Sequence, residues 1–217
     1  MWGTWNRRWT AEEGRHAIVI RDYLTVTNAV DPRALERARM GQLSGGIVPE
    51  PETVLDTFIY VALQELATRI AHRNTGKMLS DPSGYDVMAR VAADENLHYL
   101  FYRDMTTAAV AMDPSSAVIA MERQVREFEM PGTGIADFYS HALAIAKAGI
   151  YDLSLHHDQI LIPVILRHWQ VEQLEGLSPE AEEARKHLLT RIARIGKAAE
   201  RLAARKEEDA EKAAASA

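Results

Sequence analysis

Two Glu-x-x-His steps constrain the fold of this chain more than any other feature. They are Glu13-Gly14-Arg15-His16 and Glu95-Asn96-Leu97-His98, and each lies within a long helical pattern. Residues three apart lie on one face of an α-helix, so each step points a carboxylate and an imidazole in the same direction. Two such steps on two helices, with carboxylates from two more, form a two-metal carboxylate site in a four-helix bundle. The pattern therefore predicts a helical bundle with a di-iron or di-manganese site.

Surface salt bridges are the alternative interpretation of these steps. Glu13 could pair with Arg8 or Arg15, and Glu95 could pair with Arg90. For a single step the salt bridge is the better interpretation, because the spacing recurs by chance. For both steps together we favour a metal site, because small and apolar residues surround them and an ionised carboxylate is costly to bury alone.

Composition narrows the chemistry further. The 217 residues include no cysteine, which excludes disulfides, thiolate zinc sites and iron–sulfur clusters. Any metal must then be held by Glu, Asp and His, a ligand set that suits iron or manganese. A net charge of −6 argues against a nucleic-acid partner. No apolar run approaches the ~20 residues of a membrane span, and no apolar signal segment opens the chain, so we expect a cytoplasmic protein.

Helical periodicity covers the chain, and no strand pattern competes with it. Asp31-Pro32 and Ser178-Pro179 each combine an N-cap residue with a proline at the first helical position. The expected helices span about 2–29, 32–40, 52–79, 84–112, 115–128, 135–148, 158–173 and 179 onward, with a loop at 41–51. Pro163 either kinks its helix or marks the first turn. We expect one all-α domain over residues 1–202 and a polar, disordered tail over 203–217.

Glu65 is the third candidate metal ligand. It lies in the otherwise apolar segment 62–68, where a lone Glu is more often a ligand or a buried hydrogen-bonded group than a surface charge. Thr68 places a hydroxyl on the same face, although a bond to the carbonyl four residues earlier is the better interpretation of Thr68 alone. His72 is also on that face, and we expect it to support the site rather than bind metal.

Asp94 and the His156-His157-Asp158 segment have competing interpretations. Asp94 either accepts the free N–H of a metal-bound histidine or is an ordinary surface residue. The His156-His157-Asp158 segment resembles a metal cluster, but no further ligand is evident near it in the sequence. We expect it to be structural, with Asp158 as an N-cap.

Three segments carry a resemblance to soluble acyl-[acyl-carrier-protein] desaturases. The segment from Trp9 to His16 (Trp-Thr-Ala-Glu-Glu-Gly-Arg-His) resembles the first ligand step of that family, and Ala93 to His98 resembles the second. Gln64 to Thr68, followed by His72 to Gly76, is similar to the family's third ligand helix. The likeness is closest to bacterial, mycobacterial-type members and runs from about Trp2 to about Leu202.

This resemblance implies a ferritin-like di-iron four-helix-bundle core with additional C-terminal helices. It implies that Glu13 and Glu95 bridge two irons, that His16 binds one iron and His98 the other, and that Glu65 is a terminal ligand on the His98 iron. Thr68 would lie beside the O₂ site, and Asp94 on the electron path. The implied reaction is O₂-dependent insertion of a cis double bond into a fatty acyl chain on acyl carrier protein. Electrons would come from NAD(P)H through a reductase and ferredoxin, and the implied assembly is a homodimer.

The family pattern has one more terminal carboxylate, on a helix before the Trp-rich start of this chain. We therefore expect the first bundle helix to be missing here, which would also uncover Trp2 and Trp5; a capping aromatic cluster is the alternative for these rings. Glu12 points about 100° away from Glu13 on an ideal helix, so we doubt that it substitutes. Two hypotheses follow: a desaturase whose activity depends on the missing helix, or a non-catalytic shortened relative that binds acyl carrier protein or a complete desaturase. Iron storage or simple oxidase chemistry fits the fold, but not the Trp9–His16 motif.

Overall fold

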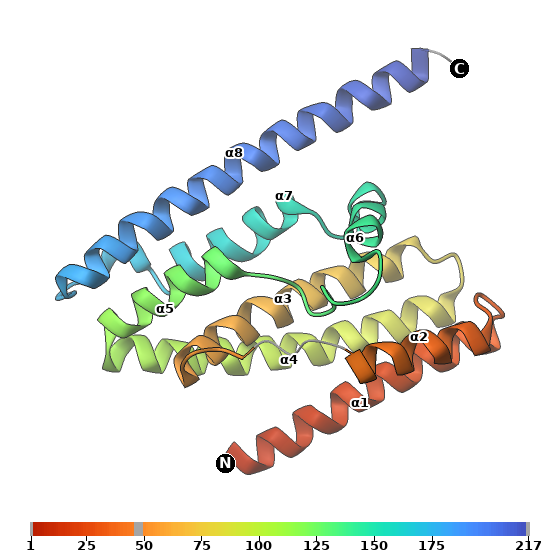
Figure 1. The fold of residues 1–217 in the computed structure, drawn as a ribbon, viewed down its shortest axis with the longest axis horizontal. Coiled ribbons are helices and arrows are strands. Elements are labelled where there is room, and N and C mark those ends of the chain that lie inside the picture. Colours follow the sequence, from red (N-terminus) through yellow and green to blue (C-terminus); the bar gives the residue numbers. More distant parts are fainter. Residues whose placement is uncertain (1, 46–49, 216–217) are drawn as a thin grey trace. The chain divides into compact units, whose positions relative to one another are not determined.

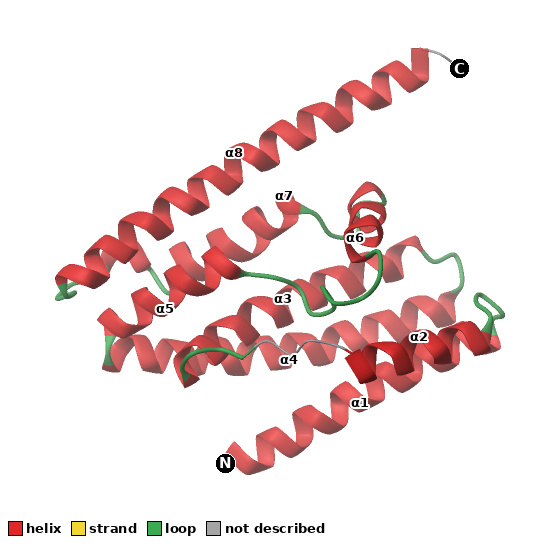
Figure 2. Ribbon diagram, in the orientation of Figure 1, coloured by secondary structure: helices red, strands yellow, loops and turns green. Residues whose placement is uncertain are grey.

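The structure is a computed structural model that describes residues 2–45 and 50–215. All of its regular elements in these residues are helices, which confirms the all-α class (Figure 1, Figure 2). Within these residues, no helix is long and apolar enough to cross a lipid bilayer. The elements are α1 (Trp2–Val26), α2 (Pro32–Gly45), α3 (Val54–Met78), α4 (Pro82–Met112), α5 (Pro114–Glu127), α6 (Phe138–Lys147), α7 (Leu153–His156), η1 (His157–His168), η2 (Val171–Gln173) and α8 (Pro179–Ala215).

The predicted N-caps explain where several helices begin. Asp31 accepts hydrogen bonds from the backbone N–H groups of Arg33 and Ala34, both at 2.8 Å, so α2 begins at Pro32. The Ser178 hydroxyl accepts one from the Ala181 N–H at 3.2 Å, and α8 begins at Pro179. These bonds satisfy N–H groups that have no partner inside the helix.

The expected loop over residues 41–51 is wrong in its first half. α2 continues to Gly45, because no proline lies between Pro32 and Pro49 and a glycine such as Gly41 only weakens a helix. Residues 46–49 of that loop lie outside the described residues.

The single helix expected over residues 158–173 is replaced by α7, the π-helix η1 and the short η2. Pro163 lies inside η1. It cannot donate a backbone hydrogen bond, and the wider π turns accommodate it. The Trp169 N–H donates to the Val164 carbonyl five residues earlier, at 2.8 Å, which is the π-helical pattern. The expectation that Asp158 is an N-cap was wrong. Its Oδ1 atom lies 2.6 Å from His157 Nδ1, and Asp152 caps α7 instead.

The last helix extends further than the sequence suggested. α8 continues to Ala215, so the expected disordered tail over 203–217 is helical as far as residue 215. The side chains of residues 200–208 are all exposed, as their polarity predicts. Ala, Glu, Lys and Arg have high intrinsic helix propensity, which explains a helix without a buried face.

The chain divides into two compact units, and each is built from separate segments. The first unit contains Met1–Glu50, Thr68–His98 and Glu129–Ile150, which include α1, α2, α6 and parts of α3 and α4. Its buried apolar side chains are on α3 and α4: Ile70, Met88, Val91 and Ala92. Helix α1 differs, because its buried residues are the polar Glu12 and His16. Polar contacts therefore help to hold α1 in the first unit, beside apolar side chains such as Ile20 and Leu24 that are only partly buried.

The second unit contains Pro51–Ala67, Tyr99–Phe128 and Tyr151–Ala217. Its apolar core lies where α5 packs along α8, with side chains such as Met121, Val125, Leu188 and Ile192 buried. Asp56 at the start of α3 is fully buried and accepts hydrogen bonds from Arg123 at 3.0 Å and from Gln124 at 3.0 Å. Because its partners are complete, this buried carboxylate is structural.

Candidate metal centre

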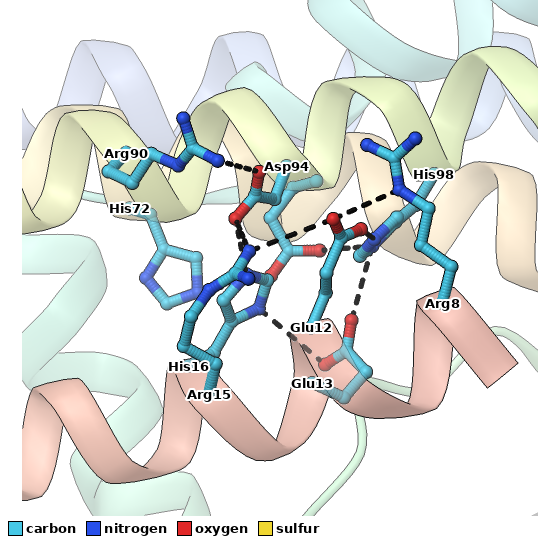
Figure 3. Close-up of polar contacts among 10 residues, drawn as sticks. Arg8, Glu12, Glu13, Arg15, His16, His72, Arg90, Asp94 and His98 are labelled. Atoms are coloured by element: carbon cyan, nitrogen blue, oxygen red, sulfur yellow. Dashed lines mark hydrogen bonds and ion pairs between the residues drawn. The ribbon is translucent and has the colours of Figure 1, made fainter.

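Both Glu-x-x-His steps lie in the first unit, where α1 and α4 bring them together. His16, Glu95 and His98 are buried, whereas the Glu13 side chain is 43% exposed. Figure 3 shows the α1 and α4 side chains pointing toward one another. Because the steps have helical spacing, one contact face on each helix supplies both an imidazole and a carboxylate.

The two carboxylates lie between the two imidazoles. Glu13 places Oε2 at 3.8 Å from His16 Nδ1 and Oε1 at 3.2 Å from His98 Nδ1. Glu95 does the same from the other helix, with Oε1 at 3.5 Å from His16 Nδ1 and Oε2 at 3.6 Å from His98 Nδ1. Each carboxylate thus offers one oxygen to each imidazole. This arrangement suits two metal ions that share two bridging carboxylates.

Three of these side chains lie close enough together to bind one metal ion. Glu13, Glu95 and His98 each offer one ligand atom, and these atoms lie within 4.8 Å of one another. Oxygen and imidazole donors with no sulfur suit iron or manganese.

A second pair of carboxylates holds the outer nitrogen of each histidine. The Nε2 atom of His98 lies 2.9 Å from Glu12 Oε2, and the Nε2 atom of His16 lies 3.2 Å from Asp94 Oδ2. Glu12 directly precedes Glu13, and Asp94 directly precedes Glu95. Each helix therefore supplies one carboxylate to the histidine of the other helix. A carboxylate that accepts the Nε2 proton fixes the tautomer and leaves Nδ1 free to bind a metal.

The salt-bridge alternative does not describe these contacts. Arg8 donates to Glu12 at 3.1 Å, and Arg15 donates to Asp94 at 2.6 Å (Figure 3). Arg90 lies 3.5 Å from Asp94, not beside Glu95 as that alternative expected. The arginines therefore pair with the outer carboxylates, while Glu13 and Glu95 face the imidazoles. The burial of Asp94 also excludes its interpretation as an ordinary surface residue.

The cluster has more negative charge than its own cations balance. Burial alone would lower the pKa of His16, but the carboxylates of Glu13, Glu95 and Asp94 outweigh burial and raise it to about 10. Burial would raise the pKa of Glu13, yet the neighbouring His16 and His98 lower it. A proton on His16 therefore adds a positive charge that balances these carboxylates, as a bound cation would.

Two buried atoms support a metal rather than a proton as that cation. Glu13 Oε1 and His16 Nδ1 have no hydrogen-bond partner within the part of the chain that the structure describes. Buried polar atoms are normally hydrogen-bonded, so an oxygen and a nitrogen that lie within ion-pair distance of the cluster but make no hydrogen bond need an explanation. Metal coordination satisfies both atoms, and the residues of the site therefore fit a pair of bound ions.

The remaining predicted residues lie on α3. His72 Nε2 is 3.6 Å from Glu95 Oε1, and burial lowers the pKa of His72, so it is a neutral neighbour of the cluster. Thr68 belongs to the first unit, whereas Glu65, three residues earlier, belongs to the second. Glu65 is only 1% exposed. Its assignment as a ligand stays a prediction.

The contact between Glu12 and His98 was missed from the sequence. The direction of Glu12 away from Glu13 was predicted, but the partner that it would meet was not. One signal was present: an acidic residue precedes the Glu of both steps, as Glu12-Glu13 and Asp94-Glu95. Since Asp94 was considered as a histidine partner, the same reasoning applies to Glu12.

Comparisons with known proteins identify relatives of this chain. The model of the fatty acid desaturase family matches residues 1–217. A protein assigned as the acyl-[acyl-carrier-protein] desaturase DesA1 of Mycobacterium tuberculosis H37Rv is 42% identical over 195 residues, or 86% of this chain and 57% of that protein. The chloroplastic palmitoyl-[acyl-carrier-protein] 4-desaturase 3 of Ophrys sphegodes is 32% identical over 92% of this chain and 52% of its own length. The chain thus spans about half the length of the curated relatives it matches.

A solved structure is also similar. It is the X-ray structure of the acyl-ACP desaturase assigned as DesA2 from Mycobacterium tuberculosis H37Rv, with a TM-score of 0.68 and 27% identity. The match covers 84% of this chain and 69% of that one. It confirms the expected ferritin-like helical fold.

Proposed function

Because the chain belongs to the fatty acid desaturase family, we propose that it carries the di-iron site of an O₂-dependent acyl-[acyl-carrier-protein] desaturase. The observation that carries this proposal is the pair of carboxylates, Glu13 and Glu95, each with one oxygen toward His16 Nδ1 and one toward His98 Nδ1. The reaction converts two adjacent CH₂ groups of the acyl chain into a cis CH=CH. With two electrons and two protons from outside, O₂ then leaves as two water molecules.

We assign five ligands to this chain. Glu13 and Glu95 would hold both irons between them, with His16 binding one iron and His98 the other. Glu65 is the terminal carboxylate on the iron bound by His98. Its burial on α3 supports this role, because a buried carboxylate needs a cation or hydrogen bonds. The iron pair supplies the redox chemistry that activates O₂.

The protein's own groups prepare the site for that chemistry. Asp94 and Glu12 accept the Nε2 protons of His16 and His98, which keeps each Nδ1 deprotonated and directed inward. Arg15 and Arg8 neutralise these outer carboxylates, so their negative charge adds little to the inner pair. Thr68 carries its hydroxyl on the same face of α3 as Glu65, where it can hold a proton beside the O₂ site.

The substrate and the partners follow from the family assignment. We propose acyl carrier protein with a fatty acyl chain as the substrate, a ferredoxin-type electron donor supplied by NAD(P)H and a reductase, and a homodimer. Acyl carrier protein is acidic, so a basic surface should bind it. Arg33 and Arg37 are exposed, four residues apart on α2, and are the candidates for that surface.

Iron stoichiometry and product formation test this proposal together. The chain is loaded with Fe²⁺ without oxygen, desalted, and supplied with ferredoxin, reductase, NADPH and stearoyl-acyl carrier protein. We expect two irons per chain and an unsaturated acyl product, and we expect Glu95→Gln to lose iron while the surface variant Glu36→Gln keeps it. Fewer than one tightly bound iron with no product would refute the assignment and leave a non-catalytic helical protein.

A further inference from the structure

A groove in the first unit has no role in the site described above. It has a volume of about 280 Å³ and lies between α3 and α4. Helix α3 contributes Arg69, Arg73 and Gly76, and α4 contributes Tyr85, Ala89, Ala92, Ala93 and Asn96. Small residues form much of its lining: Gly76, Ala89, Ala92 and Ala93.

The arginines of this groove differ from most others in the chain. Arg69 and Arg73 make no ion pair with any carboxylate of the described residues, and the same holds for Lys77. By contrast, Arg8, Arg15 and Arg123 all have carboxylate partners. Residues four apart share one helix face, so Arg69, Arg73 and Lys77 form a cationic row about 12 Å long on α3. In a chain of net charge −6, this row leaves three cations on one face of α3 without a carboxylate partner among the described residues.

Two further polar groups of the groove are also available to a partner. Tyr85 is half exposed, and neither its hydroxyl nor the Asn96 amide makes a hydrogen bond within residues 2–45 and 50–215. The nearby acidic groups do not neutralise the row. Asp94 and Glu95 contact residues of α1, and Asp86 is exposed and makes no ion pair among the described residues.

The groove lies close to the candidate metal centre. Its wall residues Ala93 and Asn96 flank the Asp94-Glu95 pair along α4. On α3, His72 lies between the two groove arginines in sequence, and its Nε2 atom is 3.6 Å from Glu95 Oε1. A protein bound in this groove would therefore contact the helices that carry the metal ligands, one side chain away from Glu95.

We propose that the groove and the row Arg69–Arg73–Lys77 form the docking site of an acidic electron-donor protein. This inference rests on the proposed function. The row is too long for one phosphate or carboxylate, but it matches carboxylates spaced along a partner surface, and paired arginines bind carboxylates in a bidentate manner. Each donor that docks is oxidised by one electron, and two dockings deliver the two electrons that one turnover requires.

A charge-reversal pair with a matched control tests the docking site. Arg69→Glu/Arg73→Glu changes the partly buried Arg69 and the exposed Arg73, four residues apart on α3, and Arg201→Glu/Arg205→Glu makes the same charge change on two exposed arginines of α8. The probe is an acidic plant-type [2Fe–2S] ferredoxin in its oxidised form, and its affinity is measured by calorimetry at several salt concentrations. We expect the α3 variant to bind about tenfold more weakly or worse, with a reduced salt dependence, and the α8 variant to bind as the unchanged chain does.

Two readouts separate this inference from the proposed function. Iron content and reduction by dithionite should be unchanged in the α3 variant, because dithionite needs no docking surface. Equal ferredoxin affinity in the α3 variant and the unchanged chain would overturn the inference. So would an α3 variant that loses acyl carrier protein binding instead of ferredoxin binding, or one that changes its oligomeric state. Absence of iron from the unchanged chain would instead refute the di-iron assignment, whatever the ferredoxin affinity.

Discussion

Metal removal should release α1 from α4 before the rest of the protein unfolds. The buried residues of α1 are Glu12 and His16, while apolar residues such as Ile18 and Val26 are 50% and 76% exposed. Other apolar side chains of α1, such as Ile20 and Leu24, are only partly buried, so apolar burial holds this helix less firmly than the fully buried core holds α5 and α8. Without metal, the like charges of Glu13 and Glu95 face each other across the α1–α4 contact and oppose it.

The size of the effect follows from mass action. A metal at 100 times its dissociation constant stabilises the state that binds it by about 2.7 kcal/mol, or roughly a hundredfold in the opening equilibrium. Amide hydrogen exchange measures this opening locally. We expect the α1 amides of the metal-free protein to exchange faster than those of α8 near Leu188, with little dependence on low urea, and to slow about a hundredfold when Fe²⁺ or Mn²⁺ is added.

Two results would refute this reasoning. One is equal protection of α1 and α8 in the metal-free protein, which would mean that other contacts hold α1. The other is unchanged α1 exchange in a sample whose measured metal content is two ions per chain. The variant Glu95→Gln provides the control, because it should remove the response to metal while leaving the exchange of α8 unaltered.

Three further predictions concern single residues. Asp94→Asn should weaken Mn²⁺ binding by about 10–100-fold in calorimetry, because His16 loses the carboxylate that fixes its tautomer, and unchanged affinity would contradict that role. Asp56→Ala should lower the free energy of unfolding in urea by about 3–5 kcal/mol, because Arg123 is left without its buried partner, and a loss below 1 kcal/mol would show that the network is not structural. Burial lowers the pKa of His156 to about 4, so its neutral form stabilises the fold above the unfolded-state pKa near 6.5, and this stability is lost as the pH falls toward 4. His156→Phe should flatten the urea stability profile between pH 6.5 and 4 by about 3 kcal/mol, and an equally steep profile would count against this assignment.

The sequence was most informative where helical geometry alone decides the outcome. The spacing within Glu13–His16 and Glu95–His98 fixes which side chains share a face, so the inner part of the site was predictable from either helix. Local caps such as Asp31 were predictable for the same reason, because their partners lie two or three residues away.

Features that depend on how two helices align were not predictable in this way. The contact of Glu12 with His98 depends on the register of α1 against α4, which no single-helix pattern contains. The effect of Pro163 depends on which hydrogen-bond pattern the surrounding packing permits, and the π-helix η1 was not expected. The end of α8 was also misjudged, because intrinsic propensity can extend a helix whose side chains bury no apolar face.

Anomalous diffraction at the iron edge tests the central claim most directly. In crystals of the chain loaded with Fe²⁺, the proposed site predicts two iron peaks about 3.5–4 Å apart, one bound by His16 Nδ1 and one by His98 Nδ1, with Glu13 and Glu95 bridging them. A single peak, a peak bound through either Nε2 atom, or the absence of iron between α1 and α4 would contradict it.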